Sequence, residues 1–196
     1  MPNGVYHVTA RGNRGERIFR NDDDSEQFLR TLADVVPRFG WGCHAYCLLP
    51  NHFHLVIETP HANLSAGMHR LNSRYATWFN RRHGFEGHVF QRRFYAVLVE
   101  SEWHLLELAR YLTLNPVRAG LCDGPRQWRW SSYPATVGAA AIPAFLDVDR
   151  VLAHFGSTRS RSQRNLARFV ADGLLQPRPG AWHRDVARLD TRTRLV

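Results

Sequence analysis

The chain of 196 residues carries 26 arginines and no lysine against 17 acidic residues, which gives a formal net charge of +9 and a pI near 10.4. Its hydrophobic content of 44% is enough to fill a core, which excludes an intrinsically disordered chain. Guanidinium groups fork onto phosphate oxygens and stack on bases, so the surplus of positive charge favours a nucleic-acid partner.

The sequence contains no run of about 18 or more apolar residues, and its N-terminus lacks a basic segment followed by an apolar one. We therefore expect a soluble, cytoplasmic protein with no membrane partner. Its three cysteines are an odd number for an intracellular chain, so disulfides are not expected.

Segments with the patterns of strands and helices alternate along the first two thirds of the chain. The predicted strands cover residues 5–10, 41–48, 52–58 and 94–99, and a glycine-punctuated basic loop follows the first of them. The first predicted helix begins at Asn21 or at one of the three aspartates that follow it and ends at Pro37. The second begins at Asn63 or Ser65 and ends near Gly84. The third begins at Ser101 and ends near Asn115.

This order predicts an α+β fold of the ferredoxin-like, split βαβ kind, in which an antiparallel sheet carries helices on one face. Residues 1–135 form the predicted domain. Residues 136–196 are expected to add a linker at 137–143, two short helices at 145–154 and 161–175, and a loose basic tail from Gln176, which together make a small C-terminal helical extension.

His52 and His54 flank Phe53 at the start of the third predicted strand. Because side chains alternate along a strand, both histidines should point the same way while Phe53 enters the core. Two imidazoles side by side can hold one divalent metal. The coordination positions that such a pair leaves open suit metal-assisted phosphate chemistry.

The last predicted helix carries a polar flank beside its leucine stripe. His104, Tyr111 and Asn115 recur at i, i+7 and i+11, which places them along one side of the helix. If this flank faces the metal, the amide oxygen of Asn115 can be a third ligand and the Tyr111 hydroxyl can reach the bound phosphate. Pro116 disfavours helical geometry at the preceding residue, so the helix should end at Asn115.

A structural zinc site is an alternative use of the same hairpin. Cys43 and Cys47 precede His52 and His54 at a spacing that invites comparison with zinc ligands. If Leu48 pairs with His52 across a three-residue bend, however, both cysteines face away from both histidines.

Five segments match the motifs of a known family in the right order. They are residues 6–14 (YHVTARGNR), 44–54 (HAYCLLPNHFH), 71–75 (LNSRY), 87–91 (GHVFQ) and 111–120 (YLTLNPVRAG). Together they resemble the HUH-superfamily single-tyrosine transposases, most closely the REP-associated tyrosine transposases, over roughly residues 4–135.

The resemblance implies an enzyme that cuts and rejoins single-stranded or hairpin DNA, as a monomer or a homodimer, with Mg²⁺ or Mn²⁺ as cofactor. It implies Tyr111 as the nucleophile of a 5′-phosphotyrosine intermediate, with His52, His54 and Asn115 as metal ligands. Arginines bind the phosphates of single-stranded DNA, and aromatic rings stack on its bases. The candidate DNA contacts are Arg11, Asn13, Arg14, Arg74, Arg92, Arg93 and Trp130.

Two alternatives stay open at this point. Family members carry a lysine after the Phe-Gln-x-Arg segment, whereas in this chain that segment, residues 90–93, is followed by Phe94 and Tyr95. Arg92 or Arg93 could supply the charge instead, and Tyr95 is a minor rival nucleophile. A non-catalytic, ferredoxin-like module that binds RNA or single-stranded DNA would also account for the charge and the fold.

Overall fold

The computed structural model describes residues 2–175 of the chain. Its antiparallel sheet has the strand order β2-β3-β1-β4, with β3 inserted between β1 and β2. This is the split βαβ arrangement, and the predicted ferredoxin-like fold is confirmed. The strands are β1 (Gly4–Arg11), β2 (Gly42–Leu49), β3 (His52–Thr59) and β4 (Tyr95–Leu98).

The long helices start where the sequence predicts them. Asn21, Asn63 and Ser101 are their N-cap residues. The helices of the described residues are α1 (Asp22–Arg38), α2 (Leu64–His83), α3 (Glu102–Arg118), α4 (Tyr133–Thr136), α5 (Asp149–Leu152) and α6 (Arg159–Asp172), with short 3-10 turns η1 (Asn13–Gly15) and η2 (Pro125–Gln127).

The C-terminal part differs in detail from its prediction. Helix α4 was not expected, α5 is shorter than the predicted 145–154, and α6 is shifted towards the N-terminus relative to 161–175. The predicted loose tail from Gln176 lies outside the described residues. Buried side chains of α4, α5 and α6, such as Tyr133, Val151 and Leu166, join the same apolar cluster as the sheet.

Helix α1 begins with reciprocal bonds between Asn21 and Asp24. The Asn21 side chain accepts a hydrogen bond from the Asp24 backbone N–H at 3.2 Å, and the Asp24 carboxylate accepts one from the Asn21 backbone N–H at 3.3 Å. Such a capping box satisfies amides that have no partner within the first turn. The same carboxylate also accepts from the Arg20 backbone N–H at 2.7 Å.

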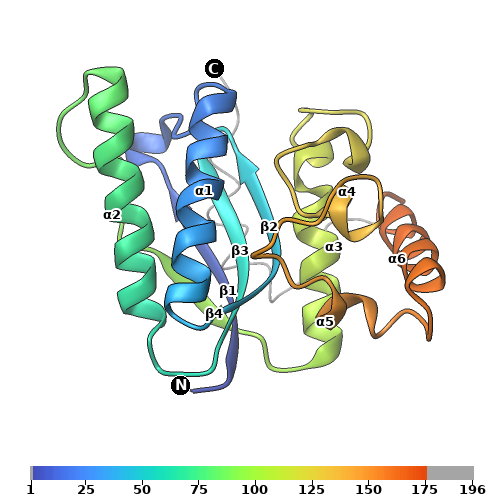
Figure 1. Ribbon diagram of the computed structural model, residues 1–196. Coiled ribbons are helices and arrows are strands. Elements are labelled where there is room, and N and C mark those ends of the chain that lie inside the picture. Colours follow the sequence, from blue (N-terminus) through green and yellow to red (C-terminus); the bar gives the residue numbers. More distant parts are fainter. Residues whose placement is uncertain (1, 176–196) are drawn as a thin grey trace.

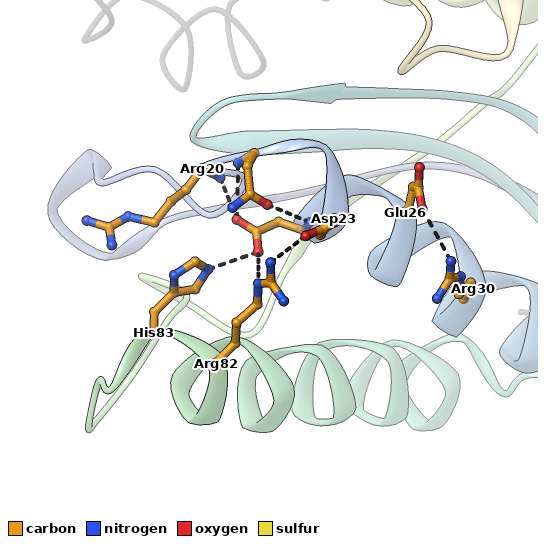
Figure 2. Close-up of polar contacts among 8 residues, drawn as sticks. Arg20, Asp23, Glu26, Arg30, Arg82 and His83 are labelled. Carbon is orange, nitrogen blue, oxygen red and sulfur yellow. Dashed lines mark hydrogen bonds and ion pairs between the residues drawn. The ribbon is translucent and has the colours of Figure 1, made fainter.

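Ion pairs join the start of α1 to the end of α2 (Figure 2). Arg82 pairs with Asp23, and His83 contacts the buried Asp24 carboxylate at 2.9 Å. Arg82 also lies 3.8 Å from Asp24. These contacts fix the two helices against each other at one end of the layer.

Helices cover both faces of the sheet (Figure 1). Helices α1 and α2 pack on the face that carries Phe53 and Leu55, while α3 lies on the opposite face, between the sheet and α6. This layout differs from the expected one, in which one face stays free. The reason is that Val56 and other apolar side chains on the second face need cover, which the leucine stripe of α3 provides.

Helix α3 continues through Pro116 to Arg118, so the expectation that it ends at Asn115 is wrong. A proline near the end of a helix removes one backbone donor. The ladder resumes after it, because the Ala119 N–H donates to the Asn115 carbonyl at 2.9 Å. Pro116 is itself buried, so packing outweighs the local preference.

The outer edge of β2 is occupied by later parts of the same chain. The Leu48 N–H donates to the Trp130 carbonyl at 2.8 Å, and the Ser132 N–H donates to the Tyr46 carbonyl at 2.9 Å. Further along the strand, the Asp147 N–H donates to the Cys43 carbonyl at 2.8 Å. These bonds satisfy backbone groups that an edge strand otherwise exposes.

Within the described part of the chain, no helix is long and apolar enough to cross a membrane.

Candidate active site

The register of β1 against β3 creates a polar strip on the α3 face of the sheet. Arg11 pairs with His52, and Thr9 pairs with His54. Directly paired residues of an antiparallel sheet project from the same face, so each histidine shares a face with its partner on β1. Because His52 and His54 are two residues apart on one strand, both histidines share that face. Phe53 lies on the other side and is fully buried, as predicted from strand alternation.

Both histidine rings and the Tyr111 ring lie close together on this face. The His52 and His54 ring centroids are 4.9 Å apart, and the His54 and Tyr111 centroids are 5.8 Å apart in an edge-to-face arrangement. The three side chains are between 1% and 5% exposed. The sheet and α3 therefore bring together the pair and the phenol that sequence reasoning placed on separate elements.

Asn115 reaches the same place from the next turn of α3. Its amide nitrogen lies 3.1 Å from His54 Nε2, and the side chain is 4% exposed. His104 does not join this group: it lies seven residues before Tyr111, about 10 Å along the helix axis. There its Nδ1 accepts a hydrogen bond from the Glu100 N–H at 3.4 Å. Burial lowers the pKa of the His104 ring, and the nearby Glu100 carboxylate raises it by a smaller amount.

Each metal-candidate histidine has a hydrogen-bond partner on its Nδ1. His52 Nδ1 lies 2.7 Å from Asn51 Oδ1, and His54 Nδ1 lies 3.0 Å from His7 Nε2. The His7 and His54 rings are also stacked, with centroids 5.2 Å apart. Sequence reasoning gave neither partner a role, although the alternation of polar and apolar residues from His7 to Arg11 marks a polar strand face.

Two imidazoles and a side-chain amide form the donor set at this position. Among residues 2–175, no group of three or more His, Cys, Asp or Glu side chains could hold a metal ion, so Asn115 is needed to extend the histidine pair. Imidazole nitrogen suits transition metals, and amide oxygen suits harder cations. The Asn115 amide turns its nitrogen to His54 Nε2, so it would have to rotate for its oxygen to join the two imidazoles around a divalent cation. Such a set has fewer ligands than Mg²⁺ or Mn²⁺ takes, and phosphate oxygens would supply the rest.

The cysteines do not share one side of the hairpin. A two-residue turn pairs Leu49 with His52 and Cys47 with His54, and a bulge near Cys43 reverses the pattern. The predicted register, with Leu48 opposite His52, is wrong because the turn is one residue shorter than assumed. Cys47 lies on the His54 face, whereas Cys43 lies in the cluster beneath α1. Burial, and secondarily Asp147, raises the pKa of the Cys43 thiol to about 12.

The basic loop after β1 sits beside the histidine pair. The Gly12 N–H donates to the Asn51 carbonyl, and the Asn51 side-chain amide donates to the Gly15 carbonyl at 3.1 Å. Arg11 is half-buried, while Asn13 and Arg14 are exposed. Arg14 has a positive φ of 54°, which turns the chain sharply at this point.

The segment that leads into β4 lies against this loop. The Asn13 N–H donates to the Val89 carbonyl at 2.8 Å, and the Gln91 N–H donates to the Arg11 carbonyl at 2.9 Å. Arg92 and Arg93 follow directly and are exposed. Four candidate DNA-binding arginines thus lie on two adjoining segments next to the histidine pair.

The other two DNA candidates have different surroundings. Arg74 on α2 pairs with Asp34 on α1 at 3.1 Å, in the helix layer on the far side of the sheet from the histidines. Trp130 is half-buried beside the end of β2, and the Arg129 guanidinium lies 4.3 Å from its ring centroid.

Tyr95, the rival nucleophile, is 40% exposed at the start of β4. It pairs with Thr9, which pairs in turn with His54, so one strand separates Tyr95 from the histidine. Two strand spacings amount to about 10 Å. Tyr111 is therefore the tyrosine nearer to the His54 ring.

Comparisons with known proteins agree on the fold and on the family. A solved structure of a REP-associated tyrosine transposase bound to a REP hairpin superimposes with a TM-score of 0.61, at 18% identity over 76% of this chain and 88% of that chain. A Haemophilus influenzae protein named as a REP-associated tyrosine transposase is 29% identical over 151 residues, which cover 71% of this chain and 85% of the relative. The family described as "Transposase IS200 like" matches residues 1–115, more than half of the chain. The protein belongs to the IS200-like transposases.

Proposed function

We propose that this transposase cuts and rejoins single-stranded DNA through a covalent link between Tyr111 and a 5′ phosphate. The observation that carries the proposal is the approach of the Tyr111 ring to within 5.8 Å of the His54 ring, with Asn115 on the next turn of the same helix. Phosphoryl transfer needs a nucleophile beside groups that neutralise phosphate charge.

His52, His54 and Asn115 are the residues that would hold Mg²⁺ or Mn²⁺. Bound there, the cation would polarise the scissile phosphate and favour the ionised form of a nearby phenol.

Tyr111 would supply the attacking oxygen. Its Oη forms a bond to phosphorus and gives its proton to solvent, while the bond between phosphorus and the 3′ oxygen breaks and that oxygen takes up a proton. The phosphotyrosine ester keeps the energy of the broken bond. A second 3′-hydroxyl can therefore reverse the step and join a new strand without nucleotide hydrolysis.

One chain contains every group that this scheme uses, so the proposed reaction needs no residue from a second copy. Tyr111, His52 and His54 are all nearly buried, however. A DNA strand must therefore displace neighbouring side chains before its phosphate reaches them.

The proposed substrate is a hairpin flanked by a single strand. The fold of a transposase solved with a REP hairpin supports this choice, as does the REP-associated name of the Haemophilus influenzae relative. On this chain, Arg11 and Arg14 would contact phosphates beside the histidine pair, and Arg92 and Arg93 would extend the same surface.

The test incubates purified protein with hairpin oligonucleotides from beside its own gene, in the presence of Mg²⁺ or Mn²⁺. We expect a covalent protein–DNA adduct that a chelator prevents and that Tyr111→Phe abolishes. Tyr95→Phe is the matched control, because it removes the same hydroxyl from the other tyrosine on this face, and it should leave the adduct intact.

Adduct formation by Tyr111→Phe would refute the nucleophile assignment. Hairpin binding without adduct formation under any metal condition would favour the non-catalytic nucleic-acid-binding module instead.

A further inference from the structure

We propose that Asn51 and His7 are positioning residues that keep the proton of each metal-candidate imidazole on Nδ1. The Nε2 atom of His52 then presents its lone pair to the cation. The Nε2 atom of His54 does the same once the Asn115 amide, whose N–H holds that lone pair in the metal-free protein, turns its oxygen to the cation. This inference rests on the proposed function for the identity of the ligand, but the tautomers themselves belong to the protein without metal.

The direction of the hydrogen bonds around Asn51 follows from a backbone carbonyl. The Gly15 carbonyl can only accept, so the group that Asn51 turns towards it at 3.1 Å is the amide N–H. The amide oxygen therefore faces His52 Nδ1 at 2.7 Å. Because that oxygen can only accept, Nδ1 of His52 carries the proton and Nε2 carries the lone pair.

A second chain of bonds sets His54. The Asn115 amide N–H donates to His54 Nε2 at 3.1 Å, which makes Nε2 an acceptor. A neutral imidazole with an acceptor at Nε2 has its proton on Nδ1. That proton then points at His7 Nε2, 3.0 Å away. His7 is 2% exposed, so water does not compete freely for this bond.

Outer partners of this kind matter because a neutral imidazole can place its proton on either nitrogen. A proton on Nε2 blocks the atom that a cation would use. Hydrogen bonds to the other ring nitrogen fix the tautomer and the ring orientation, and their loss typically lowers metal affinity by about 10-fold to 100-fold.

Asn51 has a second consequence, because it also anchors the basic loop. Its backbone carbonyl accepts from the Gly12 N–H at 2.8 Å, and its side chain donates to Gly15. One side chain thus sets the orientation of His52 and the position of the loop that carries Arg14. A displacement of the loop by DNA would act directly on the histidine.

The primary test is nitrogen NMR of the metal-free protein with labelled histidines, at about pH 8, where ordinary imidazoles are neutral. Long-range nitrogen–proton correlations report which ring nitrogen carries the proton. We expect His52 and His54 both to carry it on Nδ1. A proton on Nε2 of either ring would overturn the inference, whether or not the protein cleaves DNA.

Paired variants separate positioning from a merely structural role. His7→Leu removes the partner of His54 Nδ1, whereas His7→Gln supplies an amide oxygen that can accept the same proton. We expect the leucine variant to lose the Nδ1 signature and to bind Mn²⁺ about 10-fold to 100-fold more weakly by electron paramagnetic resonance titration, and the glutamine variant to recover both.

Asn51→Asp divides the two roles of Asn51. A carboxylate still accepts from His52 Nδ1 but cannot donate to the Gly15 carbonyl, so the tautomer should persist while the loop loosens. Equal Mn²⁺ affinity in His7→Leu and the wild type would overturn the inference. Failure of the wild type to bind Mn²⁺ would instead count against the proposed function, and the NMR result would still decide the tautomers.

Discussion

Replacement of Asp24 by asparagine should destabilise the protein by about 2–3 kcal/mol, because this carboxylate is fully buried and accepts several bonds at once. It receives the Arg20 N–H at 2.7 Å and the His83 ring nitrogen at 2.9 Å (Figure 2). Asparagine keeps the size of the side chain. It offers one acceptor oxygen where the carboxylate has two, so one buried donor would face an amide N–H.

The magnitude comes from two contributions. Loss of a hydrogen bond to a charged group costs about 1.5–3 kcal/mol, and a weakened helix cap costs about 1 kcal/mol, part of which the remaining oxygen recovers. The matched control is Asp23→Asn. Asp23 pairs with Arg82, but its side chain is 62% exposed, and exposed pairs contribute about 0–1 kcal/mol.

Urea denaturation at neutral pH, followed by circular dichroism, measures both variants under the same conditions. We expect the midpoint of Asp24→Asn to fall clearly below that of the wild type, and the midpoint of Asp23→Asn to stay close to it. Equal losses in the two variants would refute the argument that burial, and not charge pairing alone, makes this carboxylate important.

Three further predictions concern the core, the thiols and the DNA surface. In Gly67→Ala the new Cβ would lie 2.1 Å from the Trp41 ring. Calorimetry should therefore show that the free energy of unfolding falls by about 1–3 kcal/mol, although alanine has the better helix propensity. A gain in stability would contradict this packing argument. At about pH 8 a thiol reagent should label Cys122, while Cys43 stays protected until urea unfolds the chain, because Cys43 is fully buried. Mass spectrometry measures both labelling rates, and equal rates would contradict the burial of Cys43. Arg14→Ala should weaken hairpin binding and flatten its dependence on log salt concentration by about 0.7–0.9, and an unchanged slope would remove Arg14 from the interface.

Local patterns in the sequence predicted the parts of the fold that depend on neighbouring residues. Strand alternation placed His52 and His54 on one face and Phe53 in the core, because the period of two is a property of the backbone itself. The capping residues Asn21 and Ser101 were found for the same reason, since their side chains bond amides within one turn.

Features that depend on distant contacts were not found. The hairpin register was misjudged by one residue, since pairing along the whole strand and a bulge near Cys43 decide it. Pro116 does not end α3, because burial of that segment overrides a local preference. The hydrogen bond between His7 and His54 depends on the pairing of β1 with β3. The sequence alone shows that β1 has a polar face, but it does not show which residue of another strand contacts His7.

The occupied edge of β2 limits how two copies of this transposase can associate. Because the segments around Ser131 and Leu146 already bridge to this strand, a second molecule cannot continue the sheet there unless it first strips those segments away. Such an exchange would also pull at Trp130, which is bonded next to the hairpin that carries both histidines. Self-association through β2 would therefore disturb the proposed reaction centre, and assembly of two copies side by side has to use another surface.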